Sequence, residues 1–309
     1  MKIMNHLDIN DKPQTIISQF LRVIGLGKIT RHVNFKRRSA LPLASIISWL
    51  MTVHFTRRSL YRAHPDPRFS IRTARNVLND GRINWQKLVA LIARALIHWL
   101  RSFIDQRRRW AFIIDDTLLA RPFSKQTELL ARTRDHDKGV SVSGYRGLTL
   151  GWSDGNTFLP VNFALMSTRN PRYLIGRPSR IHDRRTIAGQ RRDLARRPMS
   201  GVAIELIKQA ISLGVRASYV LFDSWYGSPK MFWRLKSMRL NGLGMLKRSS
   251  KVYYRYRGRQ YSIKALYRRL AVSKMSRKNH YLYSSVVEAH YQNHLFKLKV
   301  VFVAKKGAT

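Results

Sequence analysis

The side chains best suited to chemistry in this sequence are aspartates that follow short apolar runs. Asp115 and Asp116 follow the run WAFII, and Asp223 follows the run ASYVLF. Both runs are typical of buried strands, and a carboxylate at the end of such a strand is held rigidly while its oxygens stay exposed at the edge of a sheet. Oxygen ligands of this kind suit Mg²⁺ or Mn²⁺. Two such ions about 3.5–4 Å apart can activate the attacking oxygen and stabilise the leaving oxygen of a phosphodiester, so the sequence predicts a two-metal site.

A purely structural role for these aspartates is the alternative. The chain has 59 Lys and Arg but 16 Asp and Glu, so any carboxylate has many possible arginine partners. Asp115, Asp116 and Asp223 are therefore also candidates for ordinary ion pairs. The occurrence of the same arrangement at two strand ends favours the metal site.

The charge balance indicates an anionic partner. The formal net charge is +43, and so basic a surface repels itself unless an anion covers it. Nucleic acid is the predicted partner, and a membrane is not, because the longest apolar stretch, residues 40–55, is shorter than the roughly 20 residues that a bilayer requires. The chain contains no cysteine, which excludes disulfides and thiolate metal sites and fits a reducing compartment.

Changes in pattern along the chain predict three regions. Residues 1–105 repeat apolar residues at helical spacing between basic clusters, which predicts a helical DNA-binding region. Residues 106–249 alternate strand-like and helix-like segments and are predicted to form the catalytic core. Residues 250–309 alternate aromatic or branched residues with polar ones, as hairpins do, which predicts a β-rich insertion.

Within these regions the sequence predicts individual elements. Asn84 is the expected first cap of a helix, and Asp154 beside Gly155 is expected to form a turn. Strands are predicted at residues 110–114, 148–152, 158–166, 217–222 and 243–246, and helices at residues 199–213 and 229–238.

Three segments together carry a resemblance to a family. The segments FIIDDTLLAR, HDKGVSVSGYRGLTLGWSDGNTFLPVNFALMS and LFDSWYG resemble insertion-sequence transposases of the IS-four type, which are DDE recombinases. The resemblance covers about residues 111–303. It implies an α/β fold with an RNase-H-like mixed sheet, flanking helices and a β-rich insertion. It also implies that Asp116, with Asp115 as its neighbour, and Asp223 are the first two catalytic and metal-binding carboxylates.

The chain departs from the family at the third carboxylate. That glutamate belongs to a motif with Tyr, then Arg three residues on, then Glu four residues beyond, and the sequence contains no such motif. Its glutamates are Glu128, Glu205 and Glu288, and none has both Tyr and Arg at the required spacing. We therefore expect a truncated or frameshifted transposase that binds DNA but cleaves it poorly.

Basic and aromatic residues supply candidate DNA contacts. Lys138 and Arg146 are expected near the scissile phosphate, although a polar turn is an equal reading for the neighbouring segment at His136 and Asp137. Trp225 and Tyr226 either stack on DNA or pack under the sheet. A further set of closely spaced arginines is predicted to track successive phosphates: Arg184, Arg185, Arg191, Arg192, Arg196 and Arg197.

The resemblance implies a transposase that binds the terminal inverted repeats of an insertion sequence, cleaves them with metal ions and joins the freed 3′-hydroxyl to target DNA. The implied partners are double-stranded DNA and a second subunit in the synaptic complex, in the bacterial cytoplasm at the nucleoid. Two alternatives stay open. A non-catalytic basic nucleic-acid-binding protein explains the charge but not the aspartates, and an RNase-H-like nuclease that is not a transposase explains both.

Overall fold

The structure is a computed structural model that describes residues 13–33, 41–64, 66–135, 138–177, 183–272 and 281–303. It divides the chain into two compact units. The first contains residues 1–110 and 116–216, and the second contains residues 111–115 and 217–309. Strand β1 (Ala111–Ala120) contributes its first half to the second unit and its second half to the first.

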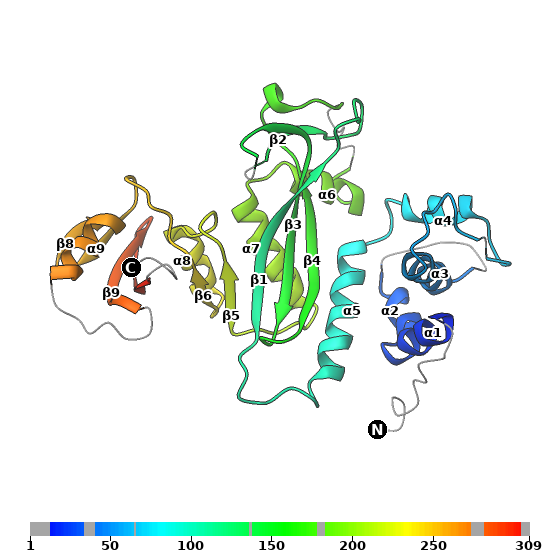
Figure 1. Ribbon diagram of the computed structural model, residues 1–309, viewed down its shortest axis with the longest axis horizontal. Helices are drawn as coiled ribbons and strands as arrows, with labels where there is room; N and C mark the ends of the chain where they lie inside the picture. The colour runs from blue at the N-terminus through cyan, green and yellow to red at the C-terminus, as the bar shows by residue number, and fades with distance from the viewer. Residues whose placement is uncertain are drawn as a thin grey trace. The chain divides into compact units, whose positions relative to one another are not determined.

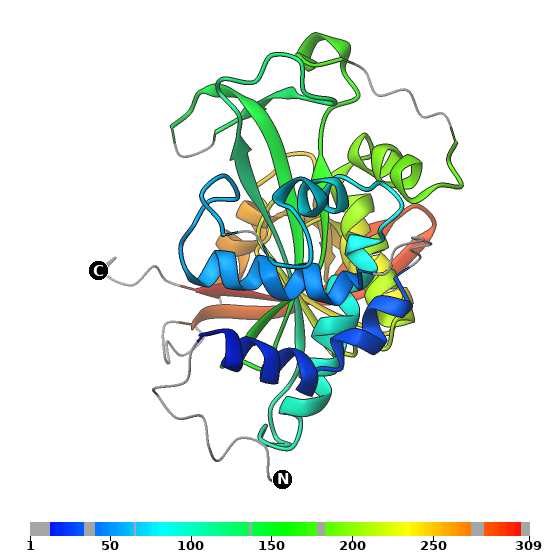
Figure 2. The ribbon, with the colours of Figure 1, turned by 90° about the vertical axis from the view of Figure 1, so that its right-hand side faces the viewer.

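The first unit begins with helices packed around an apolar core (Figures 1 and 2). Ile46 is fully buried in that core, as the helical spacing of apolar residues predicts, and Ile83 from the loop before α5 is fully buried there too. The helices are α1 (Pro13–Val23), α2 (Leu26–Arg31), α3 (Leu43–Phe55), α4 (Ile71–Leu78) and α5 (Trp85–Leu100). The predicted cap of α5 is confirmed, because the Asn84 side chain accepts a hydrogen bond from the Lys87 amide at 2.9 Å.

A long antiparallel hairpin follows in the same unit. Strand β3 (Ser141–Ser153) pairs first with β2 (Ala131–Arg134) and then with β4 (Phe158–Met166). The turn between β3 and β4 is the predicted one, since Asp154 Oδ1 accepts from the amides of Asn156 and Thr157 at 3.1 and 2.7 Å. Helices α5, α6 (Ile187–Ala195) and α7 (Met199–Ser212) pack on β4, and a short 3-10 helix, η1 (Pro171–Tyr173), precedes α6.

The second unit continues the sheet and adds a smaller one. Strand β5 (Tyr219–Phe222) pairs in parallel with the first half of β1 and with β6 (Asn241–Gly244), and α8 (Pro229–Ser237) connects β5 to β6. The second sheet contains β7 (Tyr253–Tyr256), β8 (Arg259–Ser262), β9 (Tyr281–Tyr291) and β10 (His294–Val303). Helix α9 (Ile263–Val272) follows β8 and was not predicted.

The larger sheet has the strand order β2–β3–β1–β5–β6, with β4 also paired to β3. It is mixed, because the β3 pairings with β2 and β4 are antiparallel while β5 pairs in parallel on both sides. The predicted α/β class, a mixed sheet with flanking helices, is confirmed. Among the described residues, no helix has the length and apolarity needed to cross a bilayer.

Candidate active site

Strand β1 is longer than predicted and carries two aspartates within it. We expected the strand to end at Ile114, but it continues to Ala120. The reason lies in β3, where Gly144 allows a backbone approach that a side chain would prevent: a Cβ at that position would lie 2.5 Å from the Leu119 carbonyl oxygen. Phe112 and Ile114 are buried on one face of β1, and Asp116 continues that face.

Asp116 forms an ion pair with an arginine of β3. The Arg146 Nη1 atom donates to Asp116 Oδ2 at 2.9 Å, and the two side chains are only 17% and 13% exposed. Arg146 Nη2 also donates to the carbonyl oxygen of Arg134. The guanidinium therefore fixes the Asp116 carboxylate from one side. Arg146 was predicted as a DNA contact, and this geometry makes it first a partner of Asp116.

Asp223 has a different environment in the second unit. Strand β5 ends at Phe222, so the prediction that Asp223 directly follows the strand is confirmed. Asp223 is exposed, and its Oδ1 atom accepts a hydrogen bond from the Trp225 amide at 3.0 Å. Because Ile114 and Phe222 are the last partners in the parallel pairing, Asp115 and Asp223 each directly follow one of these two residues.

The two aromatic residues after Asp223 have separate roles. Tyr226 is 1% exposed and packs in the core, whereas Trp225 is 53% exposed. The ammonium group of Lys247 lies 5.2 Å from the centre of the Trp225 ring, within the range of a cation–π contact. The packing alternative therefore holds for Tyr226, whereas the Trp225 ring is half-exposed and lies beside Lys247.

The three glutamates of the chain, which are the remaining candidates for a third carboxylate, lie on other elements, and two of them form ion pairs. Glu128 accepts from Arg192 at 2.5 Å, and Glu288 lies in β9 and forms an ion pair with Arg255 at 3.7 Å. Glu205 lies on α7. Among the described residues, no three His, Cys, Asp or Glu side chains gather as a metal-binding group. Asp116 within β1 and Asp223 after β5 still fit Mg²⁺ by their chemistry, because this ion is commonly held by one or two carboxylates together with waters and substrate phosphate.

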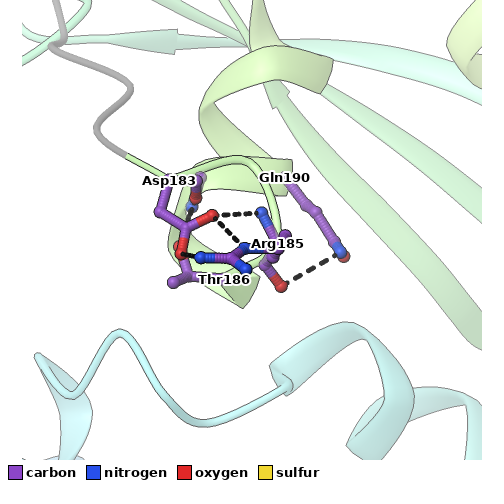
Figure 3. A network of polar contacts seen from close by, with 5 residues as sticks. Asp183, Arg185, Thr186 and Gln190 are labelled. Carbon is purple, nitrogen blue, oxygen red and sulfur yellow. Dashed lines mark hydrogen bonds and ion pairs between the residues drawn. The ribbon is translucent and has the colours of Figure 1, made fainter.

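The predicted arginine stripe begins in a loop that caps α6. Asp183 Oδ1 accepts from the Arg185 amide and Nε at 2.9 and 3.1 Å, and Thr186 Oγ1 donates to the Asp183 carbonyl at 2.8 Å (Figure 3). Gln190 Nε2 reaches the Arg185 carbonyl at 3.5 Å. Gly189 packs so closely that a Cβ there would lie 2.1 Å from the Asp183 oxygen. The loop is therefore an ordered helix start.

The arginines of the stripe differ in how they are used. Arg185 and Arg197 form ion pairs with Asp183 and Asp193, and Arg192 with Glu128. Arg184 is exposed, and the Arg196 backbone oxygen accepts from Arg169. Arg191 is half-buried, and burial together with the neighbouring Arg192 charge lowers its pKa. Lys138 is exposed, and its amide donates to Asp135 at 3.2 Å, while His136 and Asp137 lie outside the described residues.

Comparison with known proteins identifies the family. The family model for DDE superfamily endonucleases matches residues 35–273. The chain belongs to the DDE superfamily endonucleases. No curated protein matches it.

Solved structures of transposases resemble this DDE superfamily chain weakly. The piggyBac transposase synaptic complex with hairpin DNA is 13% identical, with a TM-score of 0.30, and the match covers 94% of this chain and 52% of that one. The Drosophila P element transposase strand transfer complex is 10% identical, with a TM-score of 0.25, and the match covers 84% of this chain and 55% of that one. The chain spans about half the length of each.

Proposed function

We propose that this chain is a DNA transposase of the DDE type, related to the IS-four insertion-sequence enzymes. The observation that carries the proposal is the pairing of β1 and β5 in parallel, with aspartates following the paired residues Ile114 and Phe222. Family membership and the net charge of +43 support it. The substrate is double-stranded DNA at the terminal repeats of an element, and two subunits act in the synaptic complex.

We propose Asp116 and Asp223 as ligands of Mg²⁺ or Mn²⁺. The choice of Asp116 follows the family resemblance, since the residue that directly follows Ile114 is Asp115. When bound, the metal supplies Lewis-acid activation for cleavage and transfer of a phosphodiester. Arg146 holds the Asp116 carboxylate in one orientation through its bond of 2.9 Å. Exposed basic side chains such as Lys138 and Arg184 neutralise DNA phosphates.

We further propose that the 309-residue chain binds DNA well but cleaves it weakly. The support is that none of its three glutamates stands in the Tyr–Arg–Glu motif. A metal ion with fewer carboxylate ligands is held less firmly, which lowers the rate of cleavage. The affinity for DNA is affected less, because it depends on contacts to phosphates.

A second candidate is a DNA-binding protein without catalysis. The ion pair between Arg146 and Asp116 favours it, because a guanidinium at 2.9 Å gives Asp116 a purely structural use. In that case the family fold would be retained for DNA binding alone.

Plasmid nicking in Mg²⁺ or Mn²⁺, beside a gel-shift titration, tests these proposals. We expect DNA binding that weakens with salt and weak nicking that Asp116→Asn and Asp223→Asn each abolish. Nicking that survives both substitutions would refute the metal-site assignment, and the complete absence of nicking with intact DNA binding favours the second candidate. Strong nicking that depends on Asp223 would instead contradict the expected weak cleavage.

A further inference from the structure

A cavity of about 390 Å³ lies within the first unit, among α4, α5, β4 and α6. Its volume is within the range of small-molecule sites. One wall is fixed by a long-range hydrogen bond, in which Gln86 Nε2 at the start of α5 donates to the Phe163 carbonyl of β4 at 2.6 Å. Tyr145 closes another side, and its hydroxyl donates to the Glu128 carbonyl at 2.7 Å. The cavity is therefore built by contacts between segments that are distant in sequence.

The cavity lining contains more positive than negative side chains. Arg191 and Arg192 both line it, and so does Glu128. Glu128 accepts two bonds from Arg192, at 2.5 and 3.2 Å, so these two charges offset each other. No hydrogen bond or ion pair to Arg191 is seen among the described residues. A half-buried guanidinium without an anion is unfavourable, and an anionic ligand would relieve that cost.

The rest of the lining suits an aromatic heterocycle. Phe163 lines the cavity from β4 and is 37% exposed, so part of its ring is not covered by the protein. Leu165 lies on the same face of β4, two residues on. Asn79 and Gln86 line the cavity from the neighbouring segments, and Gln86 Nε2 is already bonded to the Phe163 carbonyl. Side-chain amides such as that of Asn79 bond to the edges of bases.

We propose that this cavity binds one unstacked nucleotide, with its base against Phe163 and its phosphate at Arg191. A guanidinium for phosphate, an aromatic face for the base and amides for its edge are the three parts of such a site. The nucleotide is either part of a bound DNA strand or a free mononucleotide, and the chemistry of recognition is the same. The first source rests on the proposed transposase function, whereas the second does not.

The experiment uses the full chain in two arms. In the first arm, dAMP, dTMP and inorganic phosphate are titrated by calorimetry. In the second arm, duplex DNA carrying 2-aminopurine is bound, and the fluorescence reports whether a base leaves the stack. We expect Phe163→Ala and Arg191→Ala each to weaken the response about tenfold, in keeping with the loss of one stacking or phosphate contact.

Matched control variants distinguish the loss of a cavity contact from the loss of an aromatic or basic residue elsewhere on the surface. Phe123→Ala removes an aromatic residue that is 96% exposed and is not part of the cavity lining, and Arg172→Ala removes an exposed arginine that is also outside the lining. Both should leave mononucleotide binding unchanged. Phe163→Tyr and Arg191→Lys should retain most of the mononucleotide binding. These conservative variants keep the test valid if an alanine variant does not fold.

Each outcome decides the proposal. A 2-aminopurine signal that depends on Phe163 and Arg191 supports a nucleotide of the DNA, and mononucleotide binding alone with the same dependence supports a free nucleotide. The proposal is overturned if neither probe responds, if Phe163→Ala and Arg191→Ala change nothing, or if phosphate alone binds as tightly as dAMP. None of these readouts requires cleavage, so a failure of Asp116 and Asp223 as metal ligands would be seen separately.

Discussion

The two strands that carry the candidate metal ligands hold them differently, since Asp116 lies within β1 and Asp223 follows the end of β5. On β1, Asp116 is 13% exposed and bonded to Arg146, which is itself only 17% exposed and also bonded to a backbone carbonyl. After β5, Asp223 is exposed, and its Oδ1 atom accepts a hydrogen bond from the backbone amide of Trp225, two residues away. One carboxylate thus contributes to packing between strands, while the other stands at the start of a loop.

Because of this difference, removing Asp116 should affect both the stability of the fold and metal binding, whereas removing Asp223 should affect metal binding alone. A carboxylate that is fixed by an arginine is held ready for a ligand, but its removal also leaves a half-buried cation without its anion. An exposed carboxylate in a local turn can be removed with little structural cost. If both aspartates serve one reaction, substituting either should weaken activity and metal binding to a similar extent. The free energy of unfolding, in contrast, should fall more for Asp116 than for Asp223.

The largest expected effect is on metal binding. Asp116→Asn and Asp223→Asn should each weaken Mn²⁺ binding by tenfold or more, since the loss of even an outer partner of a metal ligand costs 10- to 100-fold. Electron paramagnetic resonance of free Mn²⁺ measures this directly.

Asp66→Asn is the matched control for that titration. Asp66 is also 13% exposed and bonded to an arginine, Arg68, but it lies in the helical region. Equal weakening by all three substitutions would mean that Mn²⁺ follows general negative charge, and the strand-end site would then be wrong.

The second effect concerns unfolding. Asp116→Ala should lower the free energy of unfolding by about 1–3 kcal/mol, because Arg146 loses a charge-assisted hydrogen bond in a partly buried place. Asp223→Ala should change it by less than about 0.5 kcal/mol. Urea unfolding followed by circular dichroism gives both values, and an equal loss in the two variants would remove the contrast between the strand ends.

A third aspartate provides a purely structural reference. Asp154 is buried in the β3–β4 turn, where Arg108 Nη1 lies 3.3 Å from its Oδ2. Burial alone would raise the pKa of Asp154, but bonds from the Thr157 and Asn156 amides outweigh it and hold the pKa below its usual value of 3.8. A lowered pKa stabilises the fold at pH values above 3.8, and the contribution is lost as the pH falls through the folded-state value.

Asp154→Asn should therefore cost about 1 kcal/mol at neutral pH and leave Mn²⁺ binding unchanged. The difference in unfolding free energy between the wild type and this variant should shrink below about pH 4, as the wild-type carboxylate becomes protonated. A difference that stays constant between pH 7 and pH 3 would contradict the assignment, and so would weaker Mn²⁺ binding.

Local pattern predicted much of the fold. Strand β4 was predicted with its observed bounds, and the Asn84 cap and the Asp154 turn were predicted from residue type. Each depends on neighbours in sequence, such as an amide two or three residues away. Helix α6 was missed, because its arginines dominate the pattern and its start depends on the fit of Gly189 against the Asp183 carbonyl.

The candidate site was predictable in its residues but not in its contacts. The sequence identified Asp116 and Arg146 separately, one as a metal ligand and the other as a DNA contact. Their ion pair joins residues 30 positions apart and depends on β1 continuing beyond Ile114. That continuation is set by pairing with β3, which no local pattern contains. The same limit applies to Arg191, whose environment is created by α5 and β4.

The smallest expected effect concerns the loop after β5. Trp225 is 53% exposed beside Lys247, in the segment that begins at Asp223. If this loop meets DNA, Trp225→Ala should weaken binding about threefold, less than a full base stack provides, while the unfolding free energy stays unchanged. Fluorescence anisotropy with labelled duplex DNA measures it, and Trp225→Phe should restore most of the affinity because it retains an aromatic face. Identical affinities for the wild type, Trp225→Ala and Trp225→Phe would show that Trp225 does not contribute to DNA binding. The comparison between β1 and β5 would then concern only Asp116 and Asp223.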